Sequence, residues 1–133
     1  MLAPRALILR GPGTNCDEET AHAFERAGGH TKRVHVRALA QSPSLLDDFQ
    51  IFCIPGGFSY GDRLRAGVIA AHSPIISDVK SMAKKGVPVL GICNGFQILV
   101  ESGLLPGVLL KNTTMNFMCK WINLIVQNNN TPF

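Results

Sequence analysis

The chain has 133 residues, of which 46% are hydrophobic and 17% are charged, a composition typical of one globular domain. Its formal charge of +4 comes from basic residues that are scattered along the chain, without the basic, aromatic-interleaved block of a nucleic-acid binder. No apolar run reaches the roughly 20 residues of a membrane span, and the first residues lead into a strand rather than forming a signal peptide. We therefore expect a single cytoplasmic domain over residues 1–133, with no nucleic-acid or membrane partner.

The first predicted elements are a strand and a helix joined by a glycine turn. Residues 5–10 form an apolar run that predicts a strand, closed by the Gly-Pro-Gly turn at 11–13. Asn15 stands three residues before Glu18, the spacing of a capping box, so we expect Asn15 to be the N-cap of the following helix. That helix is expected to end at the glycine pair 28–29.

Two further strands follow. Residues 34–36 predict a short second strand, and residues 45–49 a brief helical turn opened by Ser42-Pro43-Ser44. Residues 51–54 are as apolar as a central parallel strand, and the sequence Pro55-Gly56-Gly57 ends that strand.

The second half begins with a long, loosely amphipathic helical region over residues 65–85, broken near Pro74. A branched, apolar run from residue 87 predicts a fourth strand, and the spacing of apolar residues 96–100 predicts a helix that stops at Gly103. Residues 117–127 have the composition of a strand, although their alternation is imperfect.

Strands that alternate with helices predict an α/β fold in three layers, with a mostly parallel central sheet flanked by helices. Ligands of such sheets bind beyond the carboxyl ends of the strands. The loops 11–16 and 55–63 and the corner at residue 93 all leave those ends. This convergence predicts a site there.

Cys93 is the strongest candidate for chemistry. Gly91 and Gly95 flank it between the predicted strand and helix, which is the pattern of a nucleophile elbow. A helix N-terminus stabilises a thiolate, and the N–H of Asn94 would face an oxyanion formed on the attacked carbon. Gly57 is the expected source of a second oxyanion donor. The predicted chemistry is thiolate attack on an acyl carbon.

The other cysteines carry weaker signals. Cys16, Cys53 and Cys119 form no CxxC pair with each other or with Cys93, so we expect neither a zinc site nor a redox pair, and no metal. Cys53 lies inside an apolar strand and is expected to be a buried, inert thiol.

A base for Cys93 is harder to find. The chain has four histidines, all before Cys93: His22, His30, His35 and His72. His72 is the one we expect nearest the site, and Glu101 is the only acidic residue after the cysteine.

Three segments together carry a family resemblance. Residues 91–97 read Gly-Ile-Cys-Asn-Gly-Phe-Gln, which resembles the G-x-C-x-G-x-Q nucleophile motif of class I (triad) glutamine amidotransferases. Residues 55–62 (Pro-Gly-Gly-Phe-Ser-Tyr-Gly-Asp) and 13–17 (Gly-Thr-Asn-Cys-Asp) are similar to one branch of that family. This branch comprises the glutaminase subunits of phosphoribosylformylglycinamidine synthase, an enzyme of de novo purine (IMP) biosynthesis.

The resemblance implies a reaction and roles for individual residues. Cys93 would attack the side-chain amide of L-glutamine, expel ammonia and leave a thioester that water hydrolyses to glutamate. The oxyanion hole would consist of Gly57 and Asn94. The residues matching substrate-binding positions are Phe58, Gln97, Asn116 and Phe117.

The resemblance also implies partners and a flavodoxin-like fold. Ammonia would pass through a channel to the large synthetase subunit, which uses ATP and Mg²⁺, and a small third subunit would bridge the assembly. No cofactor is expected in this chain.

One departure from the family pattern limits these expectations. The family completes its triad with a histidine and a glutamate in a C-terminal segment beyond position 133. The resemblance therefore implies an N-terminal portion with an incomplete sheet, little or no activity alone, and self-association through an exposed sheet edge.

Two other readings stay open at this point. One describes the chain as a catalytically incomplete subunit that only binds a synthetase partner. The other is another cysteine-elbow enzyme of peptidase-like architecture, which Gln97 and residues 58–62 argue against.

Overall fold

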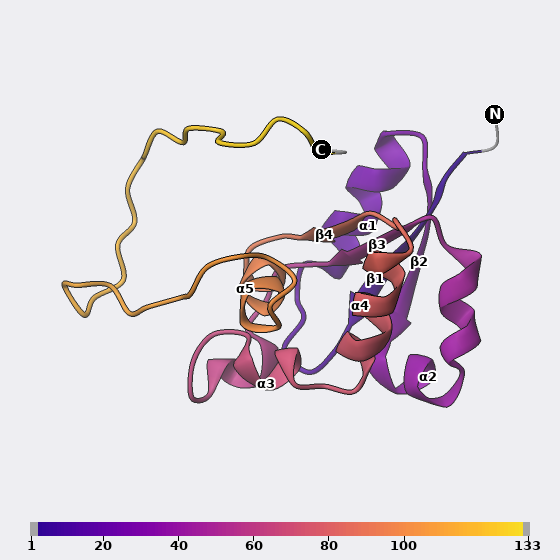
Figure 1. Cartoon of the computed structure of the whole chain (residues 1–133), viewed down its shortest axis with the longest axis horizontal. Coiled ribbons are helices and arrows are strands. Elements are labelled where there is room, and N and C mark those ends of the chain that lie inside the picture. The colour runs from indigo at the N-terminus through magenta and orange to yellow at the C-terminus, as the bar shows by residue number, and fades with distance from the viewer. Residues whose placement is uncertain (1–2, 132–133) are drawn as a thin grey trace.

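The computed structural model describes residues 3–131, and all of its regular elements lie between residues 5 and 101 (Figure 1). In chain order they are β1 Arg5–Arg10, α1 Asp17–Arg26, β2 His30–His35, α2 Val36–Gln41, a 3-10 turn Pro43–Asp48, β3 Ile51–Ile54, a 3-10 turn Ser59–Asp62, α3 Val68–Ala71, α4 Ile75–Lys84, β4 Val89–Gly91 and α5 Asn94–Glu101. The four strands pair in parallel in the order β2-β1-β3-β4. None of the described helices is long and apolar enough to cross a membrane.

The two faces of the sheet bury different helices, as the alternation along β1 shows. Leu7 and Leu9 lie in a large core, whereas Ala6 and Ile8 lie in a smaller one on the opposite face. The large core also contains residues of β3 and of the four helices α2 to α5, among them Phe52, Ile54, Leu39, Ala71, Ile75, Val79 and Ile98. The smaller core contains Ala21 of α1 and Cys53 of β3. The predicted three-layer α/β fold with a parallel sheet is confirmed.

Two predicted boundaries are wrong for physical reasons. Strand β2 begins at His30, not at residue 34. The prediction missed its first residues because β2 is an edge strand whose only buried residue is Val34. A polar edge strand lacks the apolar run that marks a central one. The N-cap of α1 is Cys16, without a side-chain cap hydrogen bond, and the side chain of Asn15 accepts instead from the Cys16 thiol at 3.1 Å.

The strand expected at residues 117–127 is also wrong. Residues 108–131 form no strand or helix, and after α5 the chain leaves the folded body as an extended segment (orange to yellow in Figure 1). Trp121 is fully exposed there, and Phe117 is 91% exposed. Strand composition alone is insufficient, because a strand needs a neighbour for its backbone hydrogen bonds.

Candidate active site

Cys93 lies at the corner between β4, which ends at Gly91, and α5, which begins at Asn94. Its backbone has φ 53° and ψ −112°, a combination that residues with a side chain rarely adopt. The cysteine is exposed. The predicted strand–turn–helix corner is therefore present, and the strain is concentrated at the cysteine itself.

The two flanking glycines are required by close contacts. A Cβ on Gly95 would overlap the carbonyl oxygen of Ile54 at the end of β3. A Cβ on Gly91 would lie 2.6 Å from Leu99 Cδ1 and 2.7 Å from the carbonyl oxygen of Gly95. The corner therefore closes against β3 only because both neighbours of Ile92-Cys93-Asn94 lack side chains.

The two loops that were expected to approach the corner are joined to each other by backbone hydrogen bonds. The N–H of Phe58 donates to the Gly13 carbonyl at 2.8 Å, and the N–H groups of Asn15 and Cys16 both donate to the Gly56 carbonyl at 3.3 Å. Gly56 also contacts the elbow. A Cβ placed on Gly56 would lie 3.4 Å from Cys16 Sγ and 3.4 Å from Cys93 Cβ. The predicted convergence of all three segments is confirmed.

The two proposed oxyanion donors, the N–H groups of Gly57 and Asn94, are not engaged by other groups of the described chain. Gly57 has φ 155°, and a Cβ there would overlap the Gly13 carbonyl oxygen, so this position requires glycine. Asn94 is the first residue of α5, so its N–H has no acceptor within the helix. Neither N–H donates a hydrogen bond to any group within residues 3–131.

The side chain of Asn94 has a role that sequence reasoning missed. It is 2% exposed; its Oδ1 accepts from the Ser59 N–H at 2.9 Å. Its Nδ2 donates to Asp62 Oδ1 at 3.1 Å and to Gln97 Oε1 at 2.9 Å. Gln97 is thus brought to the elbow, but its side-chain oxygen already accepts a hydrogen bond from Asn94.

The remaining predicted substrate contacts lie in two different settings. Phe58 follows Gly57 directly and is 62% exposed. Asn116 and Phe117 belong to the extended C-terminal segment, where the Asn116 side chain donates to the Thr114 carbonyl at 3.0 Å. The structure shows no contact between these two residues and the elbow in the described part of the chain.

Three of the four histidines have ordinary surface or capping roles. His22 and His30 are exposed on and just after α1. His35 is the N-cap of α2 and accepts at Nδ1 from the N–H of Arg37 at 3.2 Å.

His72 and Glu101 are associated with the far end of α5. Arg65 binds the Glu101 carboxylate with two hydrogen bonds of 2.6 Å, which lower the pKa of Glu101, and the charge of His72 acts in the same direction. Glu101 is the last residue of α5, about 12 Å along the helix from the end that carries Cys93. The expectation that His72 lies near the cysteine therefore gains no support.

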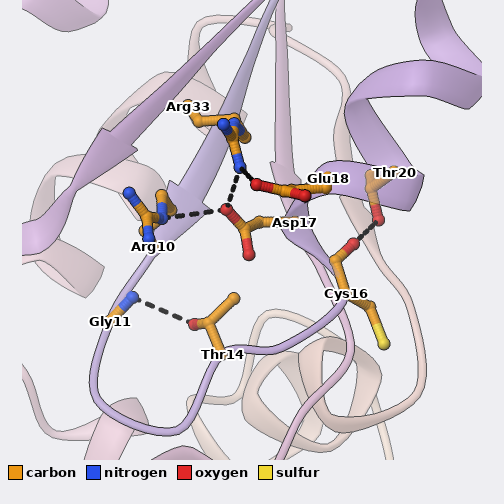
Figure 2. Close-up of polar contacts among 8 residues, drawn as sticks. All are labelled: Arg10, Gly11, Thr14, Cys16, Asp17, Glu18, Thr20 and Arg33. Carbon is orange, nitrogen blue, oxygen red and sulfur yellow. Dashed lines mark hydrogen bonds and ion pairs between the residues drawn. The ribbon is translucent and has the colours of Figure 1, made fainter.

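A buried carboxylate anchors the loop 11–16 (Figure 2). Asp17 is 6% exposed and contacts Arg10 Nε at 2.8 Å and Arg33 Nη1 at 3.1 Å. Glu18 binds the same Arg33 nitrogen at 2.7 Å, and this hydrogen bond is the main cause that raises the pKa of Arg33. Figure 2 shows both arginines, Arg10 at the end of β1 and Arg33 within β2, pointing at the first turn of α1. From the sequence, Asp17 stands out only as part of the family-like segment 13–17, and these contacts were not predicted.

We expect Asp17→Ala to destabilise the fold by about 2 kcal/mol, because it removes a buried carboxylate that makes charge-assisted contacts to two arginines, although Arg33 keeps its contact with Glu18. Urea denaturation followed by circular dichroism measures the change. The matched control is Glu19→Ala, which removes an exposed acid from the same helical turn and should cost less than about 0.5 kcal/mol. Equal effects of the two substitutions would contradict the anchoring role.

The cysteines should differ sharply in reactivity. Cys53 is buried in β3, and desolvation raises the pKa of its thiol to about 12, whereas Cys93 is exposed. At pH 8 we expect iodoacetamide to alkylate Cys93 in the folded chain and to leave Cys53 unmodified until urea unfolds the protein. Peptide mapping by mass spectrometry measures both, and early modification of Cys53 would contradict its burial.

A strained cysteine between a parallel strand and a helix, followed directly by the free N–H of the first helical residue, defines an α/β domain of the nucleophile-elbow class. Residues 3–133 match the profile of the CobB/CobQ-like glutamine amidotransferase domain, and the chain belongs to this family.

Its relatives are longer proteins. Over 132 residues the chain is 46% identical to the phosphoribosylformylglycinamidine synthase subunit PurQ of Thermotoga maritima. The matched region covers 99% of this chain and 59% of that relative. The PurQ subunit of Pyrococcus furiosus is 51% identical over 122 residues, covering 92% of this chain and 52% of the relative. A chain in the structure of PurLQS from Thermotoga maritima superposes with a TM-score of 0.85 at 45% identity, over 99% of this chain and 59% of the other. The chain thus spans between half and three fifths of the length of these relatives.

Proposed function

We propose that this chain carries the nucleophile of a glutaminase that releases ammonia from L-glutamine. Cys93 Sγ, as the thiolate, forms a bond to the side-chain carbonyl carbon, and the carbonyl oxygen becomes an oxyanion. The N–H groups of Gly57 and Asn94 stabilise that oxyanion. Its collapse breaks the C–N bond, and the amide nitrogen takes up the proton that the thiol lost and leaves as ammonia. Water then hydrolyses the γ-glutamyl thioester to glutamate and restores the thiol.

The observation that carries this proposal is the geometry of the corner. The strained, exposed cysteine is followed directly by Asn94 and lies near Gly56, the residue before Gly57, and the N–H groups of Asn94 and Gly57 have no acceptor among residues 3–131. Of the proposed substrate contacts, Gln97 binds the Asn94 side chain beside the corner, and Phe58 directly follows Gly57 in the loop that Asn94 contacts. Asn116 and Phe117 would act only with the segment 108–131 folded against it.

The names of the relatives favour a partner protein for this chain. They are named as subunits of phosphoribosylformylglycinamidine synthase, and one is a chain of PurLQS. We therefore propose that the ammonia passes to a synthetase subunit that consumes ATP with Mg²⁺ in purine biosynthesis, with a small bridging subunit in the assembly. The chain itself is proposed to need no cofactor.

A second candidate function is binding to the synthetase without turnover. It is suggested by the positions of the four histidines, none of which is placed as a base for Cys93 in the described part of the chain. In the described residues, His35 is a helix cap, His22 and His30 are exposed on the surface around α1, and His72 acts on Glu101 at the far end of α5. Glu101 itself is held by Arg65. We propose that the base and its carboxylate come from the part of the relatives that this chain does not span, so that this chain alone turns over slowly or not at all.

The test is covalent labelling of Cys93 by 6-diazo-5-oxo-L-norleucine, a glutamine-directed electrophile that needs a glutamine pocket. We expect one adduct on Cys93, protection by L-glutamine, and no protection by D-glutamine. Failure to label Cys93, or labelling that L-glutamine does not slow, would overturn the glutaminase proposal. Ammonia release with and without a synthetase partner then separates the two candidates, because measurable release that Cys93→Ala abolishes excludes the binding-only one.

A further inference from the structure

We infer that the side-chain carboxamide of Asn94 is a positioning residue that sets the separation of the two oxyanion donors. The inference rests on the proposed glutaminase function, and it concerns the side chain of Asn94, whereas the proposed oxyanion contact uses only its backbone. The two donors belong to different segments of the chain: Asn94 N–H begins α5, and Gly57 N–H follows β3. Their separation therefore depends on what joins the two segments.

The Asn94 side chain joins them directly. It accepts from the N–H of Ser59, two residues after Gly57, and donates to the carboxylate of Asp62 at the end of the same loop. Asn94 thus supplies one donor with its backbone and holds the segment of the other with its side chain. The contact to Gln97 fixes the carboxamide from the helix side.

The loop needs an external hold because its own conformation is strained. Tyr60 has φ 53° and Asp62 has φ 50°, both in the left-handed region that non-glycine residues seldom occupy. Ser59 is 8% exposed, but its buried Oγ has no hydrogen-bond partner in the described part of the chain. The Ser59 side chain therefore contributes no polar anchor. The N–H groups of Phe58 and Tyr60 on either side bind the loop 11–16, and the N–H of Ser59 binds Asn94, which ties this end of the loop to α5.

A carboxamide satisfies both sides of this contact because it carries both an acceptor and a donor. The Ser59 N–H requires an acceptor, whereas the Asp62 carboxylate requires a donor. Aspartate at position 94 would place a second carboxylate against Asp62, and leucine would leave the Ser59 N–H unpaired. The direction of the hydrogen bonds therefore offers a reciprocal test.

The test exchanges the two side chains in the chain of 133 residues. Asn94→Asp alone creates the repulsion. The double variant Asn94→Asp with Asp62→Asn restores the hydrogen bond between positions 94 and 62 with its direction reversed. The new carboxylate accepts from the Ser59 N–H and from the new carboxamide, and the Gln97 amide turns to donate. Asp62→Asn alone keeps an acceptor for Asn94 and is the matched single control. Asn128→Asp introduces the same charge at an exposed position and controls for net charge.

The readout is the ratio of two labelling rates at Cys93, by 6-diazo-5-oxo-L-norleucine and by iodoacetamide. The ratio removes changes in the thiolate fraction, which a purely electrostatic effect of the new carboxylate would produce. We expect the ratio to fall about tenfold in Asn94→Asp, the loss typical of one buried hydrogen bond replaced by a repulsion. It should return to within about threefold of the parent in the double variant, and both controls should stay within about twofold.

Two results would overturn the inference: an unchanged ratio in Asn94→Asp, or a double variant as impaired as Asn94→Asp. If Asn94→Asp fails to fold, recovery of folding together with the parent ratio in the double variant supports it, and an impaired folded double variant overturns it. Hydrogen exchange of the Ser59 amide provides an independent measurement, with faster exchange expected in Asn94→Asp and protection restored by the second change. A parent chain that the glutamine analogue does not label refutes the glutaminase proposal instead, and exchange then decides whether the Asn94 contact orders the loop.

Discussion

Replacing Cys93 by glycine should abolish covalent capture of the glutamine analogue and, at the same time, stabilise the fold. The backbone of Cys93 lies at φ 53° and ψ −112°, which costs a residue with a side chain about 1–3 kcal/mol. Glycine relieves this strain, while its greater freedom in the unfolded chain offsets roughly 0.5–1 kcal/mol of the gain. We therefore expect a net increase of about 1 kcal/mol in the free energy of unfolding, measured by urea denaturation, with no adduct detected by mass spectrometry.

The matched variant is Cys93→Ala, which removes the same sulfur but keeps a Cβ at the strained position. It should lose labelling equally, with stability within about 0.5 kcal/mol of the parent chain. A glycine variant no more stable than the alanine variant would contradict the strain, and an adduct in either one would place the nucleophile elsewhere.

Gly95→Ala should have the largest effect on stability. Gly95 lies in α5, where helix propensity alone predicts that alanine stabilises the chain by about 0.5–1 kcal/mol. The contact with the Ile54 carbonyl oxygen predicts the opposite, because β3 and α5 must move apart to admit a methyl group. We expect a loss of about 3 kcal/mol, at the upper end for overpacking.

The sign of the change decides between the two arguments. Gly103→Ala is the control, because Gly103 has φ 75° but no atom within 4 Å of its absent Cβ, so its cost of about 1 kcal/mol comes from the backbone alone. If Gly95→Ala is stabilising, or costs no more than Gly103→Ala, the corner does not close against β3 in the way described.

The elements that the sequence predicted well are those that bury an apolar face. Strand β1 and the apolar strand β3 were located correctly, because central parallel strands are continuous apolar runs. The polar first half of β2 and the short helix α2 were missed, since an edge strand and a six-residue helix carry little periodic signal. The strand expected at 117–127 failed because composition says nothing about whether a pairing partner is at hand.

The candidate site divides in the same way. The corner at Cys93 follows from glycines at fixed spacing, a local signal that survives in the sequence. The contacts of Asn94 and of Asp17 depend instead on residues 32 to 35 and 7 to 16 positions away, through loops with left-handed residues. Such contacts are set by tertiary structure, so the sequence predicted the backbone of the site but not the side chains that hold it.

The position of β3 in the sheet has a consequence for how the site meets its substrate. The carbonyl of Ile54 accepts from the Ile92 N–H at 3.0 Å, and the carbonyl of Gly56 accepts from Asn15 and Cys16. The corner and the loop 11–16 are therefore both hydrogen-bonded to β3 or to the loop that follows it directly, and a displacement of β3 moves them together. Under the proposed mechanism, β3 would carry both donor segments as one unit, and the Asn94 side chain would set their separation before any ligand arrives, so that little free energy of reorganisation is left for the moment when negative charge develops.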